Sequence, residues 1–311
     1  MTWSQCMTTP EDLERVRTYW EGSPLLAHEH PTADPIAHFS YLDEIKRTDV
    51  ERFALHFWDF PAWRGRRVLD IGCGPGWLTV QYARAGALVT AVDLTQRAVD
   101  ITRVALHHLG LDARVERGNA EELPFADGQF DLVVASGVLH HTPDTHKAMA
   151  EARRVCAHDG VGLITLYRRA WFHGRLIFPI VRRAMRWTRT RHPGANLAVE
   201  AKDADDFIRM YDGADNPVGR AMRDAEWQEL FAAAGWNVRG REHHYFPARM
   251  VGRLRTPPLA PCTTQRAPRH DDLFQARTAA QVTRRAVNQR LPAYSRTTGT
   301  SSRVRTSLIS G

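Results

Sequence analysis

The chain has 311 residues, of which 43% are hydrophobic and 25% are charged, and these proportions are those of an ordinary globular protein. They exclude a protein that is too small or too polar to form a hydrophobic core. No apolar run approaches the roughly 20 residues that a membrane-spanning helix needs. The net charge is +7 at pH 7, but residues 252–311 hold 11 arginines and 2 aspartates, so the basic character belongs to this tail.

The start of the chain and its cysteines indicate the compartment. The sequence MTWSQCMTTPEDLERV has no basic start followed by an apolar stretch, as a secretory signal would have. The four cysteines, at positions 6, 73, 156 and 262, lack the spacing of metal ligands and are expected to be reduced thiols. We therefore predict a cytoplasmic protein without a metal site.

Residues 11–64 have a helical, aromatic-rich pattern interrupted by prolines, which predicts a helical cap. From residue 66 onward, strand and helix patterns alternate. The expected strands are Arg66–Ile71, Ala87–Val92, Ala113–Arg117, Phe130–Ala135, Val161–Tyr167 and Trp236–Phe246. The expected helices are Trp77–Ala85, Ala98–Leu109, Thr145–Cys156 and Ala221–Ala234. This alternation predicts a Rossmann-like α/β fold, a doubly wound, mostly parallel sheet with helices on both faces and ligands at the carboxyl ends of the strands.

Two regions depart from the alternation. Residues 168–192 interleave eight arginines with apolar residues, and residues 193–220 have a loop-like, polar pattern. A solvated helix face, a site for an acidic substrate and a peripheral contact with an anionic membrane all stay open. No convincing strand follows Pro247, and the tail is expected to be disordered or aberrant. We divide the chain into a cap at 1–64, an α/β domain at 65–250 and a tail at 251–311.

The strongest chemical signal is VLDIGCGPGWLT at residues 68–79. An apolar strand ends in Asp70, and a turn with three glycines leads into a helix. Glycine permits positive φ and close approach of a ligand, and a helix N-terminus exposes free N–H groups. The dinucleotide fingerprint GxGxxG is the nearest alternative, but its third glycine would stand where the chain has Trp77.

Asp93 falls at the end of the second strand, 17 residues after Gly76. A carboxylate at this place can accept hydrogen bonds from both hydroxyls of a ribose. The alternative is that Asp93 caps the N-terminus of the helix that follows. Next to the glycine-rich turn, we favour the ribose interpretation.

With NAEELPF at 119–125 and FDLV at 130–133, these segments resemble the methyltransferase type 11 branch of the class I S-adenosylmethionine-dependent methyltransferases, which includes the quinone-biosynthesis type. The resemblance covers residues 50–167 well and 221–246 loosely. It implies methyl transfer from S-adenosylmethionine to a small-molecule or lipid-like acceptor. It also implies a last, antiparallel strand beside the fifth, and a helical and loop insertion at 168–220 that would cover the substrate side.

The resemblance assigns cofactor contacts to individual residues. Asp70 would hold the methionine amino group, directly or through water, and Asp93 the ribose hydroxyls. Asn119, where the family often has aspartate, and Ala120 would contact the adenine edge. Further contacts are expected at Gly72, Cys73, Gly74, Gly76, Leu94, Ser136 and Gly137.

His140 and His141 follow the fourth strand, where side chains face the reaction centre. Histidine titrates near neutral pH, so either residue suits the removal of a proton from a hydroxyl acceptor. The alternative is that one of them orients the following loop or packs beneath the cap. Further candidates on the substrate side are Tyr167, Arg168, Tyr19 and Trp20, although aromatic residues are often plain packing.

Two other classes of function stay open. A nicotinamide-dependent oxidoreductase has a similar sheet, but Asp70, the missing third glycine and Asn119 speak against it. A nucleic-acid-binding module would use the basic tail. The segment SGVLHHTPD lacks the Asn/Asp-Pro-Pro-aromatic run of base-methylating enzymes, so we expect no specific nucleic-acid partner. The acceptor atom and the oligomeric state do not follow from the sequence.

Overall fold

The structure is a computed structural model of the chain. It describes residues 9–25, 32–50, 55–169, 177–185, 215–245 and 303–310, together with 200–202, 206, 209, 210, 212 and 213. The chain divides into two units, and all described residues belong to the unit formed by Met1–Arg253 and Thr300–Gly311.

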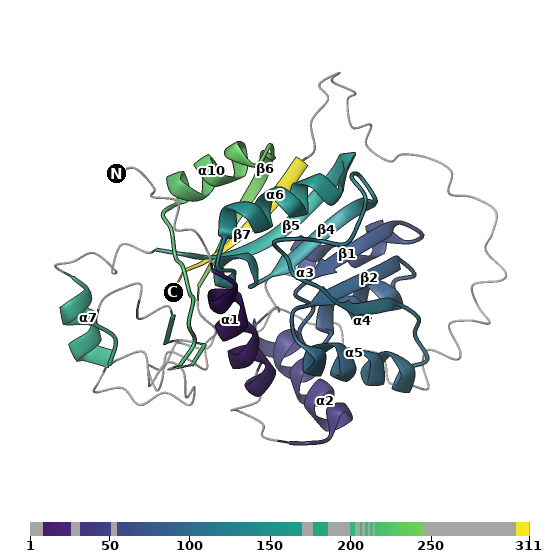
Figure 1. Cartoon of the computed structure of the whole chain (residues 1–311), viewed down its shortest axis with the longest axis horizontal. Helices are drawn as coiled ribbons and strands as arrows, with labels where there is room; N and C mark the ends of the chain where they lie inside the picture. The colour runs from purple at the N-terminus through teal and green to yellow at the C-terminus, as the bar shows by residue number, and fades with distance from the viewer. Residues whose placement is uncertain are drawn as a thin grey trace, which may run out of the picture. The chain divides into compact units, whose positions relative to one another are not determined.

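Seven strands form one sheet in the order β3-β2-β1-β4-β5-β7-β6 (Figure 1). The strands are β1 (Arg67–Ile71), β2 (Leu88–Asp93), β3 (Arg114–Arg117), β4 (Phe130–Ser136), β5 (Cys156–Arg168), β6 (Asn237–Tyr245) and β7 (Arg303–Ser310). All neighbouring pairs are parallel. The predicted parallel α/β sheet is confirmed, and the largest difference among the predicted strands is that β5 begins at Cys156 instead of Val161.

The strand β7 corrects the interpretation of the tail. No strand was expected after Pro247, yet Arg303–Ser310 pairs with β5 on one side and β6 on the other. The position beside the fifth strand is the one that the family resemblance implies, but β7 is parallel and not antiparallel. Local periodicity could not reveal β7, because its hydrogen bonds go to strands far away in the sequence. Residues 246–302 lie outside the described residues.

Helices cover both faces of the sheet, with α4 and α5 on one side and α6 and α10 on the other (Figure 1). The α-helices are α1 (Pro10–Gly22), α2 (Pro35–Ile45), α3 (Leu55–Trp58), α4 (Trp77–Arg84), α5 (Gln96–His108), α6 (Thr145–Val155), α7 (Phe178–Met185) and α10 (Asp224–Ala233). Shorter turns are the π-helical η1 (Lys46–Val50) and the 3-10 helices η2 (Phe60–Trp63) and η3 (Leu139–His141). None of the described helices is long and apolar enough to cross a membrane.

The alternation of side chains along the strands divides the core into two layers. On one face, Leu69 and Ile71 of β1 pack with residues of β4 and β5 against α6 and α10. On the other face, Val68 packs with Leu132 and Val134 against α2, α3 and α4. Each fully buried apolar side chain stabilises the fold by roughly 1.5–3 kcal/mol, so the strand ends that carry the site are firmly held.

Side chains at the helix starts explain the helix boundaries. Thr95 accepts a hydrogen bond from the N–H of Ala98 and begins α5, and Asp144 accepts one from Lys147 and begins α6. The helix predicted from Ala221 begins only at Asp224. The reason is that the carbonyl of Met222 accepts a backbone hydrogen bond from Arg169, which holds this segment extended beside the end of β5.

Candidate functional site

The glycine-rich turn joins β1 to α4 at the carboxyl edge of the sheet. Gly72, Gly74 and Gly76 have φ values of +66°, +52° and +88°, which favour glycine. The N–H groups of Gly72 and Cys73 both donate to the carbonyl of Val92, at 2.8 and 3.0 Å, and so attach the turn to the end of β2.

Space around the turn differs from one glycine to the next. A Cβ atom at Gly72 would lie 2.5 Å from the side chain of Val138, and one at Gly76 would lie 2.7 Å from that of Thr102. A Cβ at Gly74 would meet no heavy atom within 4 Å. The turn is therefore packed at its two ends and open in the middle, where a ligand can approach the backbone.

Asp93 closes the turn from the end of β2. Its Oδ2 accepts a hydrogen bond from the N–H of Gly74 at 2.9 Å, and its Oδ1 accepts from the N–H and hydroxyl of Thr95 at 2.9 and 2.7 Å. The residue that caps α5 is Thr95, so the alternative of Asp93 as an N-cap is wrong. Burial raises the pKa of Asp93, although the hydrogen bonds from Thr95 and Gly74 oppose this rise.

Asp70 lies at the end of β1 and is only 1% exposed. Thr79 of α4 donates its hydroxyl proton to Asp70 Oδ2 at 2.6 Å. Burial raises the pKa of Asp70 to about 6, opposed by the bond from Thr79; the charge of Asp93 raises it further, and that of Lys46 lowers it. Two carboxylates thus share a poorly solvated edge, where a cation would be stabilised.

The loop with Asn119 and Ala120 follows β3. The N–H of Gly118 donates to the carbonyl of Asp93 at 2.8 Å, which brings this loop to the end of β2. The side-chain oxygen of Asn119 accepts from the N–H of Glu121 at 3.0 Å. The loop therefore lies beside the carboxylate that the sequence assigns to the ribose.

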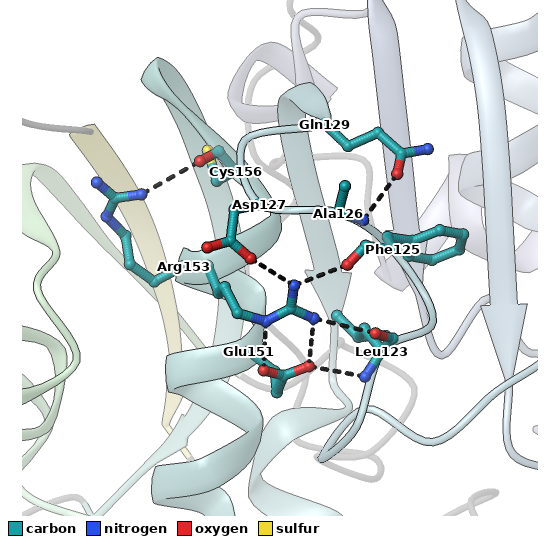
Figure 2. A network of polar contacts seen from close by, with 9 residues as sticks. Leu123, Phe125, Ala126, Asp127, Gln129, Glu151, Arg153 and Cys156 are labelled. Carbon is teal, nitrogen blue, oxygen red and sulfur yellow. Dashed lines mark hydrogen bonds and ion pairs between the residues drawn. The ribbon is translucent and has the colours of Figure 1, made fainter.

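Figure 2 shows the network that fixes the rest of this loop against α6. The guanidinium of Arg154 donates to the carbonyls of Leu123 and Phe125 at 3.0 and 2.7 Å and to the carboxylate of Asp127 at 2.8 Å. Glu151 accepts from Arg154 at 2.6 and 2.7 Å and from the N–H of Leu123 at 2.8 Å. Side chains of α6 thus hold the loop by its backbone, which restricts where Asn119 and Ala120 can lie.

His141, in η3, faces hydrogen-bond acceptors with both ring nitrogens. Nδ1 lies 2.7 Å from the carbonyl oxygen of Val218, and Nε2 lies 3.1 Å from Oδ2 of Asp212. Both ring nitrogens therefore contact oxygen atoms of the protein, so His141 is held in place by the segment around residues 212–218.

His140 has the opposite environment. Its side chain is 0% exposed, and neither ring nitrogen has a hydrogen-bond partner within the described part of the chain. The ring lies between those of His141 and Tyr167, with centroids 4.2 and 4.3 Å away. Burial, aided by the charges of His141 and Arg220, lowers the pKa of His140 well below its usual value. His140 is therefore held as an uncharged imidazole whose ring nitrogens keep their hydrogen-bonding capacity.

The N-terminal helix α1 closes this side of the site. Tyr19 donates its hydroxyl proton to the carbonyl of Asp212 at 2.5 Å, and the Trp20 ring packs edge-on against His141 at 5.4 Å. Tyr167, at the end of β5, donates to Asp212 Oδ1 at 3.0 Å. Burial, followed by the charge of Asp212, raises the pKa of Tyr19 to about 12, so this phenol keeps its proton.

Arg168 points elsewhere. Its Nε donates to Asp224 at the start of α10 at 2.5 Å, and Arg241 and His243 of β6 pair with the same carboxylate. The structure therefore gives Arg168 a role in holding β5, β6 and α10 together.

Residues 69–164 match the family model described as a methyltransferase domain. These residues form a class I methyltransferase domain. The predicted family is thereby confirmed, and S-adenosylmethionine is the cofactor that it implies.

Curated relatives of this methyltransferase domain include two ubiquinone biosynthesis O-methyltransferases. The one from Aromatoleum aromaticum is 37% identical over 97 residues, which cover 31% of this chain and 42% of the relative. The one from Thiobacillus denitrificans is 36% identical over 108 residues, or 34% and 47% of the two chains. The matches span less than half the length of each relative. Among solved structures, the YcgJ protein of Bacillus subtilis is 25% identical, with a TM-score of 0.43 over 58% of this chain and 66% of that chain.

The residues of the methyltransferase domain fit the cofactor in charge and in space. S-adenosylmethionine carries a sulfonium and an amino group, and both positive charges suit an edge that holds Asp70 and Asp93. The open space beside Gly74 admits a ligand close to the backbone. The structure thus brings together the ends of β1, β2 and β4 that carry the predicted contacts.

Sequence reasoning missed several residues at this edge. They are Thr79, which bonds Asp70, and Asp212, which joins His141, Tyr19 and Tyr167. Lys46, whose charge reaches Asp70, was also missed. Thr79 lies inside the VLDIGCGPGWLT segment and could have been noticed, because position 79 is on the first turn of the predicted helix. Asp212 and Lys46 have no such local signal.

Proposed function

We propose that this protein transfers the methyl group of S-adenosylmethionine to a hydroxyl group of a small-molecule or lipid-like acceptor. The observation that carries the proposal is that the buried carboxylate of Asp70, the half-buried carboxylate of Asp93 and the uncharged imidazole of His140 all follow the carboxyl ends of neighbouring strands of one sheet. When bound, the cofactor supplies a methyl group already activated by its sulfonium. The protein then has to orient the acceptor, exclude water and remove a proton.

The cofactor is assigned to the turn and the two strand ends beside it. Asp93 would accept hydrogen bonds from the ribose hydroxyls, and Asp70 would hold the amino group. Asn119 and Ala120 would contact the adenine, with their loop fixed by Arg154. Gly72, Cys73, Gly74, Gly76, Leu94 and Ser136 would line the remaining surface.

The acceptor is assigned to the side formed by η3, α1 and the end of β5. His140 would take the proton of the acceptor hydroxyl, and His141 would hold position through Asp212 and Val218. The rings of Trp20, Tyr167 and the two histidines pack against one another here, and such a group of rings suits a flat or apolar acceptor. The two relatives named for ubiquinone biosynthesis are O-methyltransferases, and this supports a hydroxyl group as the acceptor.

The alternatives have less support. In the dinucleotide-binding order 3-2-1-4-5-6 the sixth strand lies beside the fifth, whereas here β7 separates β5 from β6. The nucleic-acid alternative depends on the basic tail, of which only 303–310 is described. The membrane alternative depends on 168–192, of which 168, 169 and 177–185 are described.

Calorimetry with S-adenosylmethionine tests the cofactor site. We expect Asp93→Asn to weaken binding roughly 10- to 100-fold, because a charged acceptor of two hydroxyl protons is lost. Asp100→Asn is a matched control, since Asp100 lies exposed on α5. Thermal unfolding checks that both variants fold. Unchanged affinity in Asp93→Asn would remove the ribose assignment.

Transfer of a labelled methyl group to a panel of phenols and hydroquinones tests the acceptor site. Replacing His140 by glutamine should lower the turnover number roughly 100-fold or more, because general-base catalysis is lost, without changing the affinity for the cofactor. The turnover number of His141→Gln should fall less, because that ring acts by position. Equal activity of wild type and His140→Gln would exclude His140 as the base.

A further inference from the structure

Arg220 lies in the segment before α10, and the proposed function gives it no role. The residue is half-buried. Its backbone N–H donates to the carbonyl of His140 at 3.1 Å, so this segment lies directly against the turn that carries both histidines. We call residues 139–145, which include η3 and the start of α6, the histidine loop.

The guanidinium of Arg220 bonds the histidine loop further along the chain. Nη1 donates to the carbonyl of Thr142 at 2.5 Å and to the hydroxyl of Thr145 at 3.0 Å, and Nη2 donates to the carbonyl of Pro143 at 2.8 Å. The planar fork of arginine presents several donors in fixed directions, so one side chain can hold three acceptors at once. The loop is therefore fixed at three points directly after the histidines.

The sequence of the histidine loop makes it dependent on this support. Pro143 has no N–H group to donate. Thr142 is only 8% exposed, and a buried carbonyl that loses its donor destabilises the fold. From the loop after β3, Glu121 accepts a hydrogen bond from the N–H of Asp144 at 2.7 Å. Arg220 and Glu121 thus hold the histidine loop by its backbone.

The charge of Arg220 also acts on the ring of His140. In the described part of the chain, the titratable and charged groups around this ring are His141 in the same turn, Tyr167 at the end of β5 and Arg220, and Asp212 contacts the first two. Burial lowers the pKa of His140 most, and the charges of His141 and Arg220 lower it further. A fixed cation within electrostatic reach disfavours the imidazolium form, so the ring stays uncharged before an acceptor binds.

We propose that Arg220 is a positioning residue for His140, because it fixes the histidine loop by three side-chain hydrogen bonds and keeps a positive charge near it. The proposal rests on the proposed function, in which His140 takes the proton of the acceptor hydroxyl. Arg220 acts through His140 and is not assigned a contact with the cofactor or the acceptor.

Two variants separate the charge of Arg220 from its fork of donors. Arg220→Met removes both, whereas Arg220→Lys keeps the charge and loses the fork. NMR of histidine-labelled protein measures the titration of His140, with the spectrum of His140→Gln for assignment. Methyl transfer from S-adenosylmethionine to the panel of phenols and hydroquinones gives the turnover number as a function of pH.

We expect Arg220→Met to raise the titration midpoint of His140, and the acidic limb of the turnover number, by roughly one pH unit, because a cation is lost. Its turnover number should fall roughly 10- to 100-fold, because the loop is released. Arg220→Lys should keep the midpoint of wild type and recover part of the turnover. A purely structural role would leave the midpoint unmoved.

Arg103→Met is the matched control. Arg103 of α5 donates to the carbonyl of Val115 at 3.1 and 2.6 Å, so this variant also takes a guanidinium from a backbone carbonyl, but next to β3 at the other end of the sheet. It should leave the titration of His140 unchanged and the turnover number within about twofold of wild type. Calorimetry should show the same affinity for S-adenosylmethionine in every variant, and thermal unfolding checks that each is folded.

An unmoved midpoint in Arg220→Met, or a turnover number equal to that of wild type, would overturn the inference, and so would an equal fall in Arg103→Met. If Arg220→Met does not fold, Arg220→Lys decides, because wild-type turnover in that variant would mean that the fork does not position His140. If wild type binds no S-adenosylmethionine, the proposed function itself fails, and this inference fails with it.

Discussion

The proposed cofactor side and the proposed acceptor side of the site are built in different ways. On the cofactor side, partners are close in sequence: Thr79 bonds Asp70 nine positions earlier, and Gly74 bonds Asp93 nineteen positions later. On the acceptor side, the hydroxyl of Tyr19 bonds the carbonyl of a residue 193 positions away. The cofactor side consists of β1, the glycine-rich turn, α4 and the neighbouring strand β2. The acceptor side joins α1, which precedes the sheet, to a segment that follows β5.

This difference indicates which parts of the sequence determine cofactor binding and which determine acceptor binding. A compact unit can bind the cofactor in many proteins, because its contacts depend on a few adjacent residues. The acceptor side depends on packing between distant segments, so it can change without disturbing the turn. We therefore expect substitutions on the two sides to have separable effects on cofactor affinity and on acceptor use.

The largest effect is expected from Gly76→Ala on the cofactor side. Alanine would be strained at φ +88°, and its Cβ would lie 2.7 Å from Thr102. Together, strain and overpacking should lower the free energy of unfolding by roughly 3–4 kcal/mol and abolish measurable cofactor binding. Urea unfolding and calorimetry measure the two effects.

Gly110→Ala separates strain from overpacking. Gly110 has φ +63°, and an added Cβ would meet no heavy atom within 4 Å. Its loss of stability should be roughly 1 kcal/mol. Equal losses in the two variants would mean that the contact with Thr102 does not make the turn rigid.

A smaller effect, with a definite pH dependence, is expected at Asp70. Its pKa is about 6 in the folded protein against 3.8 in the unfolded chain, so the folded state holds the proton more tightly. The resulting stabilisation is present below about pH 4 and is lost as the pH rises through 6. Relative to Asp70→Asn, wild type should therefore lose on the order of 2 kcal/mol between pH 4.5 and 7.5.

Urea unfolding of both proteins across this range measures the difference, and saturating S-adenosylmethionine should diminish it by placing a cation beside the carboxylate. A difference that does not vary with pH would show that Asp70 titrates at an ordinary value.

The smallest effect is expected from Tyr19→Phe on the acceptor side. The substitution removes one hydrogen bond to the carbonyl of Asp212, worth about 1 kcal/mol. The KM for the acceptor should rise about fivefold, while the affinity for S-adenosylmethionine stays the same. Steady-state kinetics and calorimetry distinguish the two, and a parallel loss of cofactor affinity would break the proposed separation of the sides.

The same contrast explains what the sequence could predict. The segment with Asp70 and the three glycines, and the strand end with Asp93, follow from local patterns, and the structure brings them together. Glycine spacing and strand periodicity depend on neighbouring residues, which a single sequence displays. The parallel pairing of β1 to β5 follows in the same way from the alternation of strands and helices.

Other features depend on distant partners. The pairing of Met222 with the end of β5 shortens α10 by three residues from its predicted start. The strand β7 is defined by β5 and β6, more than 50 residues away in the sequence. Lys46 and Asp212 look like ordinary charged residues until the fold places them beside Trp77 and His141. For these features, the sequence lacks a local signal.

The position of β7 has a consequence for hydrogen exchange. Because β6 is the outermost strand and bonds only to β7 within the described sheet, its amide protons have no ladder partner if β7 detaches. Residues 237–245 and 303–310 should then open as one cooperative unit and exchange with deuterium at matching rates, while β1 and β4 stay protected. The slowest-exchanging amides of the protein would in that case lie in the centre of the sheet, on the strands that lead into the glycine-rich turn.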